Sequence, residues 1–356
     1  MLSTLVHLRA AGFEMAALAP AGDLSDALAA KQVEVVPFLV RDGANVRRPQ
    51  ELLRAEIRSI LRSRRPDLLH ANSLAMGRLS GPVAAECQVP SMAHLRDIIR
   101  LSATNVADLN RHSRLLAVSA ATRAAHVAQG LATEKTFVLH NGVDLEVFRP
   151  ASRTGWLHRD LGLKPERDLL VGSVGQLVMR KGQDVLARAA VSLAERFPHA
   201  HYVFVGSRYS EKEEALRFEA GLHEAFAAAG MSDRAHFLGT REDIAQLLPE
   251  LHVLAHTARQ EPLGRVLLEA AACGLAVVAT DVGGTREVFP ASNESALIVP
   301  ADDVSALAAA LDQLLADVEL RQKLGAAARR RVEEAFAVER AAGALAEHYR
   351  TVLAGV

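Results

Sequence analysis

The chain has 356 residues, of which 50% are hydrophobic and 4% aromatic, and a formal net charge of -1 at pH 7. Its length fits about two domains with sizeable cores, while the balanced charge and few aromatic side chains argue against nucleic-acid binding. The two cysteines, Cys87 and Cys273, stand in apolar helical stretches, so we expect buried thiols and a cytoplasmic protein. We expect no secretory signal, and no apolar run is long enough to span a membrane.

Helical and strand-forming segments alternate through the first part of the chain, which predicts a parallel α/β sheet. A doubly wound fold normally opens with a strand and a Gly-rich turn, and neither stands at the start of this sequence. We therefore interpret the chain as beginning inside the first helix, with that strand missing. The predicted helices are 3–11, 27–31, 50–64 and 120–129, and the predicted strands lie in 13–19, 33–38, 67–71, 89–97, 115–118 and 137–144. The helix at 50–64 presents one apolar face, formed by Leu52, Leu53, Ile57, Ile60 and Leu61.

Polar side chains follow two of these strands at their carboxyl ends, where ligands bind in open α/β sheets. His70 and Asn72 follow the third predicted strand, and His94, Arg96 and Asp97 end the fourth. An imidazole can donate or accept a hydrogen bond near neutral pH, which suits a binding site. A structural interpretation stays open, in which the histidines are packed and Arg96 pairs with Asp97 at the surface.

The second part of the chain repeats the alternation and predicts a second doubly wound domain. Its predicted strands are 168–174, 201–205, 235–238, 252–255, 275–279 and 296–299. Its predicted helices are 182–197, 212–229, 243–248, 264–273 and 304–315, followed by a charged helix at 319–334, a break at Phe336 and a last helix at 339–353.

Two carboxylates stand at the start of one of these helices, in the stretch from His256 to Val288. Glu261 lies in the loop before Gly264, and Glu269 lies about a turn and a half into the helix. A helix N-terminus attracts a diphosphate, so a nucleotide sugar could bind here with its phosphates at the start of this helix. Glu269 could then accept hydrogen bonds from the ribose diol, and Glu261 from the group beyond the phosphates. The alternative is a surface helix with two solvated glutamates.

A second glycine-containing turn, from Gly172 to Gly182, could bring a cation to that diphosphate. Lys181 is the first choice because its long stem can reach across a cleft, and Arg180 is the second. The pair Gly283-Gly284, after the fifth strand, allows close approach of a ligand or is a plain tight turn.

The stretch with Glu261 and Glu269, continued by Gly283, Gly284, Arg286, Glu287 and Val288, resembles the E-x7-E signature of retaining GT-B glycosyltransferases, the family 4-like enzymes of group 1. The segment HNGVDLEVFRP, from His140 to Pro150, is similar to the family's passage between its two lobes. The resemblance implies a GT-B fold of two Rossmann-like domains facing a cleft. It implies an acceptor-binding domain at 1–150, a nucleotide-sugar domain at 151–336, and a helix at 337–356 that crosses back to the first domain.

The resemblance also implies roles for individual residues. Catalytic roles fall on His94 and Glu261. Donor binding falls on Gln176, Arg180, Lys181, Thr240, Leu263, Gly264, Arg265 and Glu269, where Gln176 stands in place of the family's usual arginine. The acceptor side falls on His70, Asn72, Arg96 and Asp97.

The expected activity is retaining, metal-independent transfer of a hexose from a UDP- or GDP-sugar to a hydroxyl of a glycan, lipid or small molecule, as in cell-envelope polysaccharide synthesis. No cofactor is expected, and the leaving phosphate takes the acceptor proton. Contact of Arg62 to Arg65 with the inner face of a membrane stays open, as does the oligomeric state. The alternatives are a sugar-nucleotide epimerase or hydrolase on the same fold and an inactive nucleotide-sugar-binding protein. A dinucleotide dehydrogenase is disfavoured because neither half opens with G-x-G-x-x-G.

Overall fold

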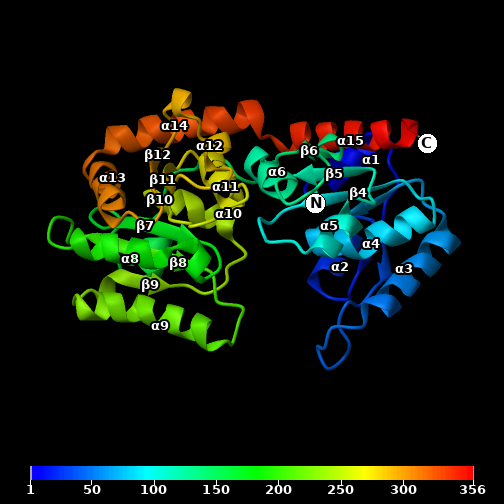
Figure 1. Ribbon diagram of the computed structural model, residues 1–356. Helices are drawn as coiled ribbons and strands as arrows, with labels where there is room; N and C mark the ends of the chain where they lie inside the picture. The colour runs from blue at the N-terminus through cyan, green and yellow to red at the C-terminus, as the bar shows by residue number, and fades with distance from the viewer. Residues whose placement is uncertain (1, 356) are drawn as a thin grey trace. The chain divides into compact units, whose positions relative to one another are not determined.

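The computed structural model describes residues 2–355, and the chain divides into two compact units. Unit 1 comprises Met1–Gly142 and Val338–Val356, and unit 2 comprises Val143–Ala337. Each unit has its own parallel sheet and its own apolar core (Figure 1).

Unit 1 contains a four-stranded parallel sheet in the order β3-β4-β5-β6 and a separate parallel pair, β1-β2. The sheet strands are β3 (Leu69–Ala71), β4 (Ser91–Leu95), β5 (Arg114–Ala117) and β6 (Thr136–Val138), and the pair is β1 (Ala16–Ala19) and β2 (Glu34–Pro37). The helices are α1 (Leu5–Ala10), α2 (Asp23–Ala30), α3 (Gln50–Arg64), α4 (Leu74–Glu86), α5 (Ala103–Leu109), α6 (Ala120–Val127) and α15 (Val338–Ala354).

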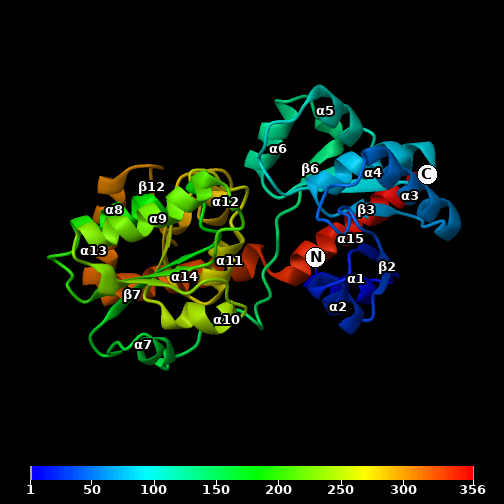
Figure 2. The same ribbon diagram turned by 90° about the horizontal axis from the view of Figure 1, so that it is seen from below.

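Alternate residues of β4 and β5 enter different cores, because successive side chains of a strand point to opposite faces. Ala93 and Leu115 pack with apolar residues of α4 and α5, whereas Met92 and Leu116 pack with residues of α1 and α15. Helix α15 therefore covers one face of the unit 1 sheet, as both ribbon views show (Figures 1 and 2). This packing places Tyr349 of α15 over β3 and β4.

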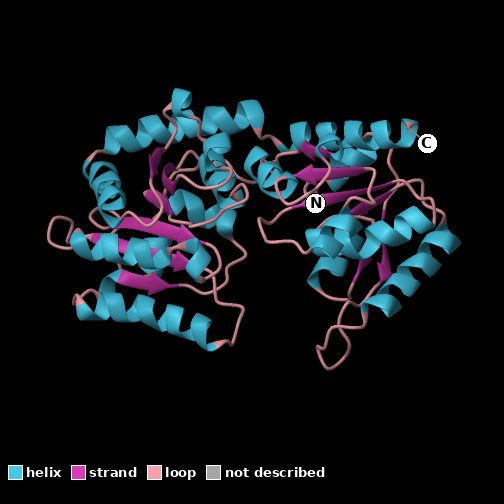
Figure 3. Cartoon of the chain, viewed as in Figure 1, coloured by secondary structure: helices cyan, strands magenta, loops and turns pink. Residues whose placement is uncertain are grey.

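Unit 2 contains a six-stranded parallel sheet in the order β12-β11-β10-β7-β8-β9. Its strands are β7 (Leu169–Val174), β8 (Ala200–Val205), β9 (Ala235–Phe237), β10 (Val253–His256), β11 (Ala276–Thr280) and β12 (Leu297–Val299). Its helices are α7 (Trp156–Asp160), α8 (Gln183–Ser192), α9 (Glu213–Ala228), α10 (Ile244–Leu247), α11 (Arg265–Ala272), α12 (Thr285–Val288), α13 (Val304–Ala316) and α14 (Val318–Ala335). Figure 3 shows these elements by type.

The central strands of unit 2 are buried on both faces. Val253, Ala255 and Val278 pack against α8, α9 and α13 in one large core, while their neighbours Leu254 and Val277 are equally buried and lie outside that core. Helices thus cover both sides of the sheet, the doubly wound arrangement that the sequence predicts. All six strands predicted for this part of the chain are present, and no strand end differs from the prediction by more than one residue.

Two expectations for the first half need correction. Leu52 does not join the buried face of α3, because 57% of its surface is exposed while Leu53 and Ile57 are fully covered. The first two predicted strands form the separate pair β1-β2 instead of joining the main sheet. Helix α4 has no counterpart among the predicted helices of the first half. Over the whole sequence, the short helices α5, α7 and α12 were also not predicted, since four to seven residues give too little periodicity to detect.

Candidate active site

The loop after β10 brings Glu261 to Lys181, which ends the loop after β7. The Lys181 ammonium donates to Oε2 of Glu261, and Nε2 of His256 lies 3.2 Å from the same oxygen. His256 and Glu261 are buried, with 5% and 7% of their surfaces exposed. Burial lowers the pKa of His256 to about 4, so its imidazole is neutral near pH 7. The three side chains form a compact charged group at the carboxyl end of the sheet.

Two glycines allow the loops around Glu261 to approach each other closely. A Cβ on Gly283 would lie 1.8 Å from the carbonyl oxygen of Glu261, and the N–H of Gly284 donates to that oxygen at 3.2 Å. A Cβ on Gly182 would lie 2.0 Å from the carbonyl oxygen of Thr257. Both positions also have positive φ, 52° and 65°, which favours glycine. The Gly283-Gly284 turn therefore supports the backbone of Glu261.

Arg259, which the sequence pattern did not single out, connects the same loops. Its guanidinium donates to both carboxylate oxygens of Asp184 at 2.8 Å, to Asp302 at 2.7 Å and to the carbonyl oxygen of Met179 at 2.6 Å. Met179 begins the short turn that ends at Lys181, so Arg259 holds the segment that carries the lysine. A planar five-donor group suits such a multiple bridge.

Helix α11 begins directly after Gly264, which has no side chain to cap the first N–H groups. Those groups and the positive end of the helix dipole make this terminus suitable for an anion. Glu269 lies further along α11 and accepts a hydrogen bond from the exposed Arg265 at 3.0 Å. The side chain of Leu263 is buried, so this residue can meet a ligand only through its backbone.

The remaining residues predicted to bind a donor lie on neighbouring loops of unit 2. Gln176 is half-buried, and its carbonyl oxygen accepts from Gln183 at 2.9 Å. Arg180 is half-buried and lies 3.5 Å from the carbonyl oxygen of Gln260. Thr240 is exposed and donates to Ser207 at 3.2 Å, on the loops after β9 and β8. No hydrogen bond or ion pair joins Thr240 to Glu261 or Lys181 within residues 2–355.

The predicted residues of unit 1 meet at the carboxyl ends of β3 and β4. Nε2 of His70 lies 2.9 Å from Nδ1 of His94, and Nδ1 of His70 lies 2.6 Å from the hydroxyl of Tyr349. His94 and Tyr349 are buried, and His70 is half-buried. Burial lowers the pKa of His70 to about 3 and that of His94 well below its usual value, so both rings are neutral near pH 7.

Arg96 connects the two strand ends. Its guanidinium donates to the carbonyl oxygen of Asn72 at 3.1 Å and to the Asn72 side-chain oxygen at 2.7 Å. It also donates to the side-chain oxygen of Asn141 at 2.9 Å. Asp97 is exposed, and its carbonyl oxygen accepts from His126 at 2.8 Å. Tyr349 and Asn141 were missed as site residues because neither stands near these strands in the sequence.

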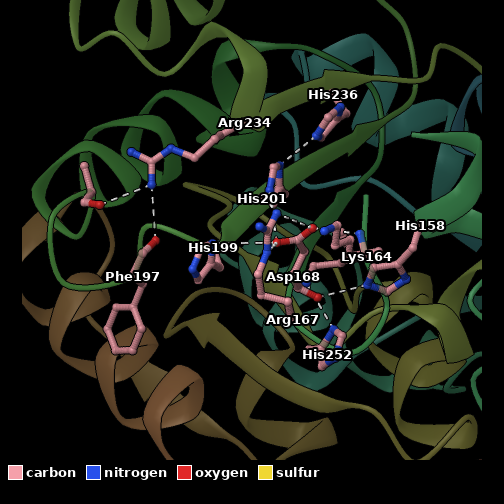
Figure 4. Close-up of polar contacts among 12 residues, drawn as sticks. His158, Lys164, Arg167, Asp168, Phe197, His199, His201, Arg234, His236 and His252 are labelled. Carbon is pink, nitrogen blue, oxygen red and sulfur yellow. Dashed lines mark hydrogen bonds and ion pairs between the residues drawn. The ribbon is translucent and has the colours of Figure 1, made fainter. Parts of the chain in front are cut away.

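Other polar groups lie away from these residues. A buried carboxylate, Asp168, stands before β7 with several histidines near it (Figure 4), at the opposite end of the strand from Lys181. An open cavity of about 450 Å³ in unit 1 is lined by Arg111, Arg114 and Thr351 among others, and no predicted site residue lines it. Between residues 2 and 355, no three His, Cys, Asp or Glu side chains gather as ligands for a metal ion. None of the helices described combines the length and apolar character that spanning a bilayer requires.

Two parallel α/β units, with acidic and basic groups at the carboxyl ends of their strands, define the GT-B class of folds. The family model for group 1 glycosyl transferases matches residues 156–331, and that for glycosyltransferase family 4 matches residues 1–147. The chain belongs to this glycosyltransferase family.

Relatives and solved structures agree with this assignment. The chain is 32% identical over 274 residues to the lipopolysaccharide core biosynthesis mannosyltransferase LpsB of Rhizobium meliloti, covering 73% of this chain and 75% of that protein. It is 34% identical to a D-inositol 3-phosphate glycosyltransferase of Stackebrandtia nassauensis, over 55% of this chain and 44% of that protein. The structure of HepE from Anabaena with UDP and glucose superimposes with a TM-score of 0.80 at 25% identity, covering 92% and 89% of the two chains. Sucrose-phosphate synthase from Thermosynechococcus elongatus, at 21% identity and a TM-score of 0.78 over 100% and 92% of the chains, shares the fold.

Proposed function

We propose that this glycosyltransferase moves a hexose from a nucleotide diphospho-sugar to a hydroxyl acceptor and retains the anomeric configuration. The observation that carries the proposal is the pairing of Lys181 with Glu261 beside the open N-terminus of α11. A cation and a helix N-terminus suit a diphosphate, and a buried carboxylate suits the hydroxyls of a sugar. The two named relatives are sugar transferases, and HepE was crystallised with UDP and with UDP-glucose, which supports a nucleotide sugar as the donor.

In this proposal, residues 151–336 bind the donor. Lys181, Arg180 and the first N–H groups of α11 stabilise the charge that develops on the leaving diphosphate. Glu269 accepts hydrogen bonds from the ribose, and Glu261 accepts them from the hexose. When the diphosphate binds, the Lys181 ammonium lies between two anions, and neutral His256 remains beside Glu261. Gln176 supplies a hydrogen bond but no charge, which leaves Lys181 as the principal cation.

Residues 1–150 and the helix at 337–356 form the acceptor side, with His70, Asn72, Arg96 and Asp97 near the acceptor and His94 near the transferred sugar. The transition state has oxocarbenium character, as in other glycosyl transfer. We assign no protein nucleophile and no resident metal, and the leaving phosphate takes the acceptor proton. Adding a chelator should therefore leave the rate of transfer unchanged.

Two of the three arginines between Arg62 and Arg65 pair with acidic side chains of unit 1. Arg64 donates to Glu34 at 2.8 Å, and Arg62 lies 3.4 Å from Glu86. These pairs reduce the positive charge that an anionic membrane would attract. We therefore favour a soluble or small glycan acceptor over direct recognition of lipid head groups at this helix.

A donor screen followed by product analysis tests the proposal. A UDP- or GDP-sugar that binds the native state should raise the melting temperature. The same donor, given a hydroxyl acceptor, should yield a product with the donor's anomeric configuration by proton NMR. Release of free or epimerised sugar without an acceptor would favour the epimerase or hydrolase alternative. Binding without any transfer would favour a binding protein, and no stabilisation by any nucleotide sugar would contradict the proposal.

A further inference from the structure

Tyr349, His70 and His94 form a continuous hydrogen-bonded chain inside unit 1. The Tyr349 hydroxyl lies 2.6 Å from Nδ1 of His70, and Nε2 of His70 lies 2.9 Å from Nδ1 of His94. The last ring nitrogen, Nε2 of His94, has no hydrogen-bond partner among the residues that the structure describes. This nitrogen is therefore available for a substrate, and whether it carries a hydrogen depends on Tyr349 and His70.

Each neutral imidazole carries one N–H, so the hydrogen bonds among Tyr349, His70 and His94 can run in either of two directions. In the first, the Tyr349 hydroxyl donates to His70, His70 donates to His94, and Nε2 of His94 carries a hydrogen. In the second, His94 donates to His70, His70 donates to the Tyr349 oxygen, and Nε2 of His94 has a lone pair. The two orders give His94 opposite roles toward a ligand.

The tyrosine hydroxyl decides between the two directions. In the second order, its hydrogen would need another acceptor, and residues 2–355 offer it no protein acceptor other than His70. Tyr349 is buried, with 8% of its surface exposed, and leaving a buried O–H without an acceptor is unfavourable. In the first order, the tyrosine O–H and the His70 N–H both have acceptors. The first order is therefore the more stable.

We propose that Tyr349 acts through His70 as a positioning residue that holds His94 in the Nε2–H tautomer, so that His94 presents a hydrogen-bond donor to a ligand oxygen. The identity of the ligand rests on the proposed function, whereas the tautomer of His94 is independent of it. It assigns a role to α15, which carries Tyr349 and packs on the sheet through Leu345 and Val352. It also means that Nε2 of His94 does not accept the proton of the acceptor hydroxyl.

Nitrogen-15 NMR of the histidine side chains tests the tautomer in the full chain without any substrate. In the unsubstituted protein at pH 7.5, we expect the His94 signal, assigned by its loss in H94Q, to show a protonated Nε2 and an unprotonated Nδ1. The Y349F variant removes the hydroxyl donor and should give a mixture of tautomers. The control is Y209F, since Tyr209 is 72% exposed and lies in unit 2. A protonated Nδ1 in the unsubstituted protein, or an unchanged tautomer in Y349F, would overturn the proposal.

Kinetics of two substitutions at His94 separate a donor from a base. Glutamine offers an amide N–H near the position of Nε2 but cannot accept a proton, whereas alanine offers neither. We expect H94A to lower kcat about a hundredfold, the usual effect of losing one aligned donor, and H94Q to keep at least about a tenth of the activity. Equal loss in both variants would contradict a donor role. If even the unsubstituted protein transfers no sugar, the proposed function fails, while the NMR result still decides the tautomer.

Discussion

At the scale of single residues, Lys181 and Glu261 each compensate a charge that would otherwise be poorly solvated, since 14% and 9% of their side-chain surfaces are exposed. The pair therefore keeps both charges compensated and holds both groups at the proposed donor site. The sequence predicted both residues from a local spacing within their own loops. It could not predict that they contact each other, because they stand 80 positions apart and meet only when β7 and β10 pair.

Replacing Lys181 with alanine should lower the rate of transfer about a hundredfold to a thousandfold, because in the proposed mechanism the leaving diphosphate loses its principal cation. The matched control is K323A, which removes a lysine from the exposed ion pair with Glu294 and should leave transfer unchanged. Initial rates at saturating donor and acceptor measure the effect. Full activity in K181A would remove the lysine from the proposed mechanism.

Replacing Gly283 with alanine tests whether the glycine turn supports Glu261. The new Cβ would lie 1.8 Å from the Glu261 carbonyl oxygen at a residue with a φ of 52°, so the loop must shift. We expect a loss of more than about 1 kcal/mol in the free energy of unfolding, together with weaker donor binding in calorimetry. G221A is the control, because a Cβ at Gly221 of α9 meets no atom within 4 Å. Equal behaviour of the two variants would show that the turn is only a connection.

At the scale of elements, hydrophobic periodicity predicted α3 and all strands of unit 2, because each of these segments buries a regular set of apolar side chains. Hydrophobic periodicity failed where distant parts of the chain decide which strands pair and which side chains meet. The separation of β1-β2 from the main sheet cannot be read from either strand, since both have the composition of sheet strands. The His70–Tyr349 contact spans 279 positions, so the role of α15 at this site also became visible only in the structure.

Asp168 directly precedes β7, at the amino end of the unit 2 sheet (Figure 4). Its buried carboxylate accepts from the N–H of Lys164 at 2.8 Å and from Arg167 at 2.7 Å. Burial acts to raise its pKa, but the hydrogen bonds from Arg167 and Lys164 lower the pKa overall. The charged form is therefore the one that the fold requires.

The D168N variant should lose about 1–3 kcal/mol of unfolding free energy while its donor affinity stays unchanged, because the side chain lies far along β7 from Lys181. The comparison variant is D312N, which removes a carboxylate from the surface pair with Arg196 and should change stability by less than about 1 kcal/mol. Urea denaturation and donor titration give the two quantities. A large loss of donor affinity in D168N would mean that the two ends of β7 are coupled.

At the scale of the whole molecule, both units bury neutral histidines, and burial is the main cause of their lowered pKa values. In unit 1 these are His70, His94, His112, His126 and His348, and in unit 2 they are His201, His236, His252 and His256. The unfolded chain binds protons at these groups near pH 6.5, while the folded chain does so only at lower pH, about 4 for His236 and His256. The unfolded state therefore holds more protons between these values, and acid favours it.

We expect the stability from these histidines to be fully present above about pH 6.5 and to be lost progressively as the pH falls toward 4. Urea midpoints measured from pH 7.5 to 5.0 should decrease, and stopping at pH 5.0 keeps the titration of the carboxylates out of the comparison. Trp156, the single tryptophan, reports on unit 2 by fluorescence, and circular dichroism reports on the whole chain. Because a two-unit chain can unfold in steps, the two signals should be fitted separately. A midpoint that stays constant or rises toward pH 5.0 would mean that the buried histidines already bind protons in the folded protein.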